Sequence, residues 1–253
     1  MNYTYRCFTG FTLAEVLITL GIIGIVAALT IPTLISKYQE KVLVENAKRN
    51  YSILMQAIQM YNADNYSANN FSILFEAGKT DKEVLNKLSQ YIKHSKICSK
   101  RDDKACGGVY DIKFTYIRNN GYGKNEGDWL YGARMVLNDG SYISLWNENK
   151  TNGHCGYEFT NHPKDENGDY IKNPDGSLVA ETLTSNRCGR IWIDTNGTKG
   201  PNRYGSDVFS ICFYDSKFGS ENTDCRNNGK IEQVLRDGKI IPYEDYDIGK
   251  DFE

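Results

Sequence analysis

Two hydrophobic patterns follow one another along the first sixty residues of the chain. Residues 16–35 (VLITLGIIGIVAALTIPTLI) are apolar almost throughout and carry no charge. From Tyr38 to Tyr61 the apolar positions recur mostly every three or four residues, with charged positions between them, which predicts an amphipathic helix. Together the two patterns predict one helix from Thr12 to about Tyr61. Pro32 removes a backbone hydrogen bond, so a bend or local melting is expected there.

A second helix and a series of strands are predicted in the rest of the chain. Thr80–Glu83 has the sequence of a capping box and precedes an apolar run, which predicts the start of a helix. Past Cys106 the pattern changes to that of strands. The predicted strands are 109–117, 133–137, 142–146, 190–194 and 208–214.

Turn sequences predict how some of these strands connect. Asn138-Asp139-Gly140 predicts a hairpin between two of them. Asp237-Gly238 predicts another hairpin, joining 234–235 to 240–241. A long helix followed by antiparallel strands predicts an α+β fold, in which the N-terminal helix packs on a C-terminal antiparallel sheet.

The apolar run has the length of a membrane span, and an acid precedes it. At about 1.5 Å per residue, its twenty positions cover roughly 30 Å, the thickness of a bilayer core. Glu15 stands immediately before the run, where a carboxylate costs on the order of 2.5–3.5 kcal/mol. A charge at this cost requires a partner, so the sequence predicts a membrane protein that assembles.

The residues around this acid resemble a known export signal. Gly10-Phe11, an acid four positions after the Phe and an apolar helix resemble the class III signal of type IV pilins and type II secretion pseudopilins. The resemblance implies that a prepilin peptidase cuts the Gly10–Phe11 bond and methylates the new terminus at Phe11. It also implies that Glu15 pairs with the terminal amine of a neighbouring subunit.

The resemblance further implies how the chain is divided and where it resides. Residues 1–10 are expected to be a leader peptide, 11–35 a transmembrane assembly helix, and 36–253 a pilin-like head that includes the amphipathic half of the first helix. The expected partners are the lipid bilayer, identical or related pilin subunits and an inner-membrane assembly platform. The chain is expected to cross the inner membrane once with its head in the periplasm, and then to enter a pilus or pseudopilus filament.

Two other interpretations of the N-terminus differ in what happens to the leader. An ordinary signal peptide has an apolar core of about 7–15 residues followed by a small-residue cleavage site, whereas this run is longer and an amphipathic helix follows it. A plain signal anchor would belong to a membrane-anchored extracellular binding protein that does not polymerise. It would explain the length but not the placement of Gly10, Phe11 and Glu15.

The cysteines fit an exported head. Loss of the leader removes Cys7 and leaves six cysteines, an even number that predicts disulfides in an oxidising compartment. Proximity favours Cys98–Cys106 and Cys212–Cys225, which leaves Cys155–Cys188 by exclusion. A metal site is a poor alternative, because the chain has no C-x2-C pair and only three histidines.

Charge and motifs exclude several classes of function. The net charge is −2, so a general nucleic-acid-binding surface is not expected. The sequence has no Walker loop, zinc-protease, serine-hydrolase or dinucleotide-binding motif. A structural subunit rather than an enzyme is therefore predicted.

One loop concentrates oxygen ligands between two predicted strands. Within residues 194–207 the candidate ligands for Ca²⁺ are Asp194, Asn196, Asn202 and Asp207, because this cation takes carboxylate, amide and carbonyl oxygens. Some major pseudopilins hold calcium in a loop near the C-terminus, so the resemblance favours the same hypothesis. The alternative is a turn whose side chains bind their own backbone. Residues 165–169 form a similar, weaker cluster. Apart from this possible Ca²⁺, no cofactor is expected.

Overall fold

The structure is a computed structural model, and it describes residues 10–67, 70–110, 112–118, 121–128, 130–150, 154–219 and 231–240. Most of the predicted leader therefore lies outside the described residues, as does Cys225. The chain divides into two compact units, Met1–Val42 and Leu43–Glu253.

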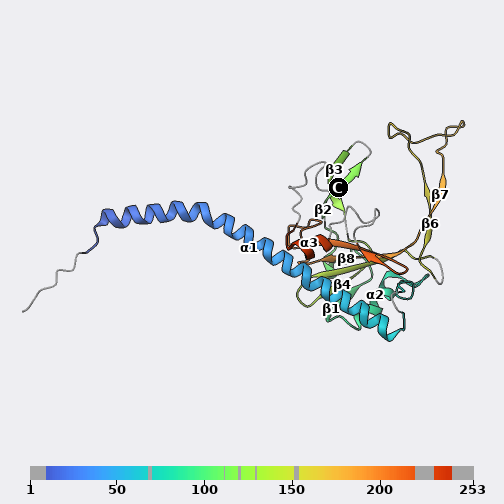
Figure 1. The fold of residues 1–253 in the computed structure, drawn as a ribbon, viewed down its shortest axis with the longest axis horizontal. Coiled ribbons are helices and arrows are strands. Elements are labelled where there is room, and N and C mark those ends of the chain that lie inside the picture. Colours follow the sequence, from blue (N-terminus) through green and yellow to red (C-terminus); the bar gives the residue numbers. More distant parts are fainter. Residues whose placement is uncertain are drawn as a thin grey trace, which may run out of the picture. The chain divides into compact units, whose positions relative to one another are not determined.

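The first helix is close to its predicted extent. Helix α1 covers Leu13–Asp64, and Pro32 lies inside it with helical residues on both sides (Figure 1). An 18-residue stretch of α1 is long and apolar enough to cross a membrane, and none of it is buried within the chain. Beyond Val42 the helix is amphipathic as predicted, because side chains such as Leu54 and Ile58 are buried.

The head is built on one antiparallel sheet of six strands in the order β1-β4-β5-β8-β9-β10. Four of these strands were expected from the sequence, whereas β1 and the short β10 were not. The bounds are β1 His94–Cys98, β4 Ala133–Leu137, β5 Tyr142–Asn147, β8 Arg187–Asp194, β9 Val208–Tyr214 and β10 Phe218–Gly219.

One face of the sheet forms the main hydrophobic core with two helices. Alternate strand residues, among them Met135, Ile143 and Ile191, join buried side chains of α1 and of α2 (Asp81–Ser89) in one cluster. Helix α2 begins as predicted with a capping box. The Glu83 carboxylate accepts a hydrogen bond from the Thr80 N–H at 2.8 Å, and the Glu83 N–H donates to the Thr80 hydroxyl.

The opposite face of the sheet is covered by loops, with a smaller cluster beneath them. Trp192, Val208 and Tyr204 are buried there, and the Trp192 indole N–H donates to the Tyr204 hydroxyl at 3.0 Å. Two short elements lie between β1 and β4 in the sequence. They are the 3-10 turn η1 (Lys104–Cys106) and a two-stranded ribbon of β2 (Ile112–Arg118) and β3 (Gly121–Asp128). The sequence predicted β2 but not β3.

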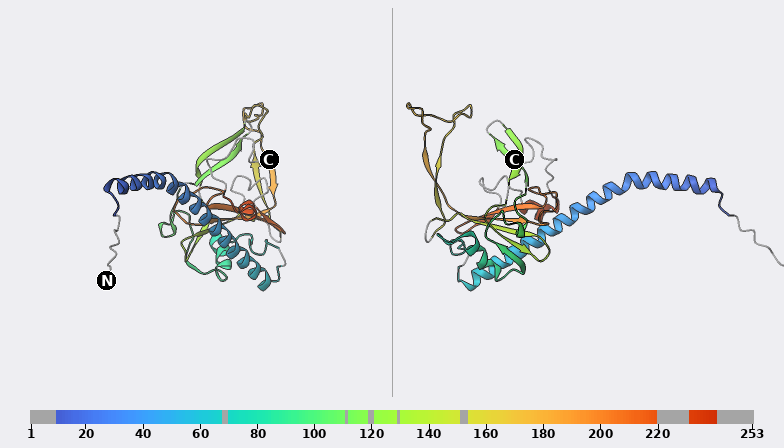
Figure 2. Two further views of the ribbon diagram at one scale, coloured as in Figure 1. Left: turned by 60° about the vertical axis from the view of Figure 1, so that its left-hand side comes forward. Right: turned by 180° about the vertical axis from the view of Figure 1, so that it is seen from behind.

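A second ribbon extends from the head. Strands β6 (Tyr157–Asn161) and β7 (Glu181–Ser185) pair with each other and with no strand of the main sheet. Both views in Figure 2 show this ribbon leading away from the sheet. We call residues 157–185 the arm. The sequence analysis did not predict it.

The hairpin predicted around Asp237-Gly238 is wrong. Residues Ile231–Asp237 form helix α3, with Ile231 and Val234 buried on one side. Gly238 has φ +65° and donates its N–H to the Val234 carbonyl, so it ends a helix instead of turning between strands. An Asp-Gly pair fits both roles, because each needs a glycine at positive φ. Residue 241 of the predicted hairpin lies outside the described residues.

Candidate functional site

The predicted cleavage position lies just before the first helix. Gly10 and Phe11 precede Leu13, the first residue of α1, and both are exposed. Phe11 retains 90% of its accessible surface. The peptide bond between them is therefore not protected by helical hydrogen bonds.

The acid that follows accepts hydrogen bonds from its own chain. The Glu15 carboxylate accepts hydrogen bonds from the Thr12 N–H and from the Thr12 hydroxyl, both at 2.8 Å, and the Glu15 N–H donates to that hydroxyl at 3.2 Å. This is the arrangement of a capping box. The same spacing predicted the capping box at Thr80–Glu83, whereas the capping box at Thr12–Glu15 was not predicted.

Beyond Glu15 the helix presents apolar side chains on every side. Leu17, Ile18 and Ile25 each keep more than 60% of their surface exposed. A helix that is apolar all round is unfavourable in water unless lipid or other helices cover it. The N-terminus therefore combines an accessible cleavage position, a capped acid and an uncovered apolar helix.

The same segment matches a described family of motifs. Residues 5–31 match the family model of the prokaryotic N-terminal methylation motif, the cleavage and methylation signal of type IV pilins and pseudopilins. The chain carries a prepilin-type signal. This motif spans 27 of the 253 residues, and it is typical of the precursors of type IV pilins and pseudopilins. The chain matches no curated protein and no solved structure.

The loop predicted to bind calcium contains two buried carboxylates. Asp194, at the end of β8, accepts hydrogen bonds from the Asn196 and Gly197 N–H groups at 3.1 and 2.7 Å, and from the Tyr110 hydroxyl. Asp207, just before β9, accepts from the N–H groups of Asn202 and Arg203 at 2.8 and 2.7 Å. Both carboxylates thus shape the backbone of the loop.

These two acids disfavour each other's charge. Burial, together with the neighbouring Asp207 carboxylate, raises the pKa of Asp194 to about 8. Burial raises the pKa of Asp207 to about 6, although the hydrogen bonds that it accepts act in the opposite direction. At neutral pH the pair therefore favours holding a proton or a cation over carrying two negative charges.

One buried cation lies near this pair. The guanidinium of Arg134 donates to the carbonyls of Cys106 and Gly108 at 2.7 and 2.8 Å, and it lies 5.4 Å from the centre of the Tyr110 ring. Tyr110 links Arg134 to Asp194 through its ring and its hydroxyl. The sequence analysis did not predict Arg134 or Tyr110 as part of this site.

The two predicted amide ligands also lie in the loop. The Asn196 amide nitrogen donates to the Gly200 carbonyl at 3.0 Å, while its oxygen is buried without a hydrogen-bond partner among the described residues. The Asn202 amide lies 3.2 Å from the carbonyl oxygens of Lys199 and Gly197, to which its nitrogen can donate. Both amides therefore bind the backbone of their own loop, as the turn alternative expects, and the Asn196 oxygen is the atom left available to a cation.

The weaker acidic cluster is a turn. The Asp165 carboxylate accepts hydrogen bonds from the Asn167 and Asp169 N–H groups at 2.9 and 3.0 Å. The Asp165 N–H in turn donates to the Asp169 carbonyl, so this segment reverses the chain within the arm.

Two of the expected disulfides are present in the described residues. Cys98 bonds to Cys106, and Cys155 bonds to Cys188. Cys212 is also a disulfide cysteine, whereas its expected partner lies outside the described residues.

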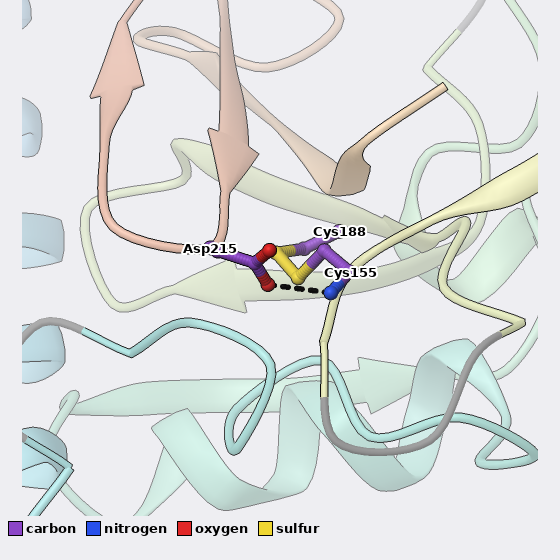
Figure 3. A group of neighbouring side chains, drawn as sticks. All are labelled: Cys155, Cys188 and Asp215. Atoms are coloured by element: carbon purple, nitrogen blue, oxygen red, sulfur yellow. Dashed lines mark hydrogen bonds between the residues drawn. A yellow bond between two sulfur atoms is a disulfide. The ribbon is translucent and has the colours of Figure 1, made fainter. Parts of the chain in front are cut away.

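Asp215 lies beside the second disulfide, and Figure 3 shows the three side chains together. Its carboxylate accepts a hydrogen bond from the Cys155 N–H. The sulfurs of Cys155 and Cys188 are bonded to each other, so neither is a thiolate that could bind a metal. The group is a structural clamp.

Proposed function

We propose that this chain is a structural subunit of a type IV pilus or a type II secretion pseudopilus. The observation that carries the proposal is the methylation motif at residues 5–31 immediately before a long, uncovered apolar helix. In this proposal, a prepilin peptidase cuts the Gly10–Phe11 bond and methylates Phe11. The apolar helices of many subunits then bundle into a core.

The Thr12–Glu15 contact suggests how the acid is handled before assembly. A carboxylate inside an apolar bundle is costly without a charged partner. In the precursor, the hydrogen bonds from Thr12 satisfy Glu15 within its own helix. After cleavage, the free amine of a neighbouring subunit supplies a positive charge, and the pairing of this amine with Glu15 sets the axial position of one subunit against the next.

Intact mass tests the processing step. The full chain is extracted from membranes of cells with and without a prepilin peptidase and weighed without reduction. We expect a chain that begins at methylated Phe11 only when the peptidase is present. A chain that begins at Met1 in both strains would instead support a signal-anchored binding protein that does not polymerise.

Replacement of the acid tests the assembly step. Glu15→Ala should leave the chain in the membrane and still cut at Gly10–Phe11, but filament yield should fall sharply because the amine loses its partner. Glu15→Asp is the matched control, since it keeps the charge. Normal filaments from Glu15→Ala would overturn the role that we give to this residue.

We further propose that the loop 194–207 binds Ca²⁺. Two observations support this: the raised pKa values of Asp194 and Asp207 mean that two negative charges are costly here unless a cation offsets them, and the buried Asn196 amide oxygen has no hydrogen-bond partner among the described residues. A bound cation would neutralise the carboxylate pair and hold both ends of the loop.

Thermal unfolding of the full chain in detergent, with added Ca²⁺ or with EDTA, tests this second proposal. We expect Ca²⁺ to raise the unfolding temperature of the wild type and of Asp165→Asn, the control in the other acidic turn. It should not raise that of Asp207→Asn. Equal unfolding temperatures of the wild type with and without Ca²⁺ would mean that hydrogen bonds and a retained proton hold the loop.

A further inference from the structure

The arm is a part of the head that contributes nothing to its core. No side chain between Tyr157 and Thr184 is buried. Phe159 and Leu183 face each other across the two strands, and each keeps 41% of its surface exposed. A two-stranded ribbon with an uncovered apolar pair is at best marginally stable in water, so the arm is suited to being covered by something else.

The base of the arm is nevertheless firmly built. The Cys155–Cys188 disulfide closes its two ends. Arg187 forms a buried ion pair with Glu148 and donates to the Tyr157 hydroxyl at 2.6 Å. A clamp of this kind fixes where the arm leaves the head without tying its outer part to the core. Such construction is expected of an element that must present a surface to a partner.

Charge indicates what the partner surface carries. Residues 157–185 hold six carboxylates against two lysines, a net charge of −4, although the whole chain has a net charge of only −2. Glu158, Glu166 and Glu181 are exposed and form no ion pair among the described residues. A basic surface would therefore complement the arm.

The same head carries a basic surface of matching character. Residues 93–104 hold five cations against two carboxylates, a net charge of +3. They include β1, the outermost strand of the sheet, whose only strand partner within the described part of the chain is β4. Lys93, Lys96 and Lys100 are exposed without an ion-pair partner in the described residues. The Cys98–Cys106 disulfide holds this segment in place.

We propose that the acidic arm of one subunit docks on the basic β1 edge of a second copy of this chain. The arm's own side chains are exposed, so the arm is not docked on its own head. An unpaired strand edge offers backbone hydrogen bonds to an incoming strand, while the lysines offer charge to the arm. The two surfaces differ, so in each contact the first subunit keeps its β1 edge free and the second keeps its arm free. Further subunits can bind these free surfaces, so the contact can repeat along a filament. The proposal rests on the proposed function, because assembly is what brings many copies together.

Photo-crosslinking in cells that express the full chain tests this contact. A benzophenone amino acid replaces Phe159, whose side chain is exposed at the apolar pair. Light should yield a dimer of this chain, and its crosslinked peptide should lie within residues 93–104. A crosslink to lipid, to a different protein or to another region of the chain would overturn the proposal.

Charge reversal gives the decisive comparison. Reversal of the three arm glutamates should lower the dimer yield by about tenfold, and so should reversal of the three lysines in and beside β1, because like charges then face each other. The two reversals combined should restore it. The variants are Glu158→Lys, Glu166→Lys and Glu181→Lys on the arm, and Lys93→Glu, Lys96→Glu and Lys100→Glu on the edge. The control for the edge reversal makes the same charge change elsewhere on the head and consists of Lys82→Glu, Lys217→Glu and Lys239→Glu.

The outcomes separate this proposal from the proposed function. The arm proposal alone fails in two cases in which the leader is cut and filaments form. In the first, neither charge reversal changes the dimer yield; in the second, the combined reversals do not restore it. If the wild-type leader is never cut and no filament is recovered, both proposals fail. None of the six exchanged side chains is buried, so a loss of yield with intact disulfides reflects the contact and not unfolding.

Discussion

At the scale of single residues, the Asp194–Asp207 pair is where burial and charge conflict most clearly. Both carboxylates are fully buried, and the buried Arg134 interacts electrostatically with Asp194. The hydrogen bonds within the loop offset the cost of burying these acids, because each carboxylate accepts from two backbone N–H groups that would otherwise lack partners. The same hydrogen bonds fit the turn that the sequence offered as the alternative to a calcium site.

The pair predicts how stability changes with pH when EDTA removes divalent cations. The pKa of Asp194 is raised to about 8 in the folded chain, from a model-compound value of 3.8. A raised acid pKa means that the folded chain binds the proton more tightly than the unfolded chain. The stabilisation is therefore complete below about pH 4 and is lost as pH rises towards 8.

Asp194→Asn checks this prediction, because the amide keeps the shape and an acceptor for the loop. We expect the wild type to lose on the order of a few kcal/mol relative to Asp194→Asn between pH 4 and pH 8. Denaturant unfolding across that range, in EDTA, measures the difference. Asp165→Asn, on the exposed arm, should follow the wild type. Parallel curves for the wild type and Asp194→Asn would show that Asp194 does not carry the effect.

At the scale of elements, the sequence predicted what local patterns determine. The span of α1, the start of α2 and the strands with clear alternation follow from periodicity and capping, and the structure confirms them. Strand β1 lies at the edge of the sheet, and its only apolar residues are Ile97 and Cys98. The alternation of apolar and polar residues along it is therefore weak. The arm has no buried face at all, and hydrophobic periodicity cannot reveal a strand that buries nothing.

The residues of the two candidate sites differ in how local their sequence signal is. Gly10, Phe11 and Glu15 belong to a contiguous motif, so the sequence alone located them. The four predicted loop ligands also fall within one short segment, residues 194–207. Arg134 and Tyr110 are separated from that loop by more than fifty residues, and the fold of the sheet brings them to it. Contacts of this kind have no local signal.

The clamp at the base of the arm gives a prediction at the element scale. Arg187→Met should destabilise the head by about 3–5 kcal/mol, because it leaves Glu148 buried without its cation. Adding Glu148→Leu to Arg187→Met removes both charges. This double variant should recover most of the lost stability, since the pair is then apolar. Denaturant unfolding of Arg187→Met, of Glu148→Leu and of the double variant measures the coupling free energy between the two side chains. If the double variant is no more stable than Arg187→Met, packing rather than charge explains the clamp.

At the scale of the whole molecule, the oxidation state of the cysteines shows whether the leader is still attached and which compartment holds the head. Cys7 is the cysteine of the predicted leader, and the remaining six belong to the head, where five are disulfide-bonded in the described residues. Disulfides persist in an oxidising compartment and not in a reducing cytoplasm. The number of free thiols therefore distinguishes processed from unprocessed chains and an exported head from a retained one.

Thiol labelling of the unreduced, denatured chain with a maleimide of known mass measures this number. In cells that lack the prepilin peptidase we expect one label, on Cys7, because the head is oxidised while the leader is retained. In cells with the peptidase we expect none, and six labels after reduction. Cys7→Ser should abolish the single label and leave the rest unchanged. Labels on Cys98 or Cys155 before reduction would place the head in a reducing compartment. That result would contradict the filament proposal and the anchored binding protein alike, because both require export.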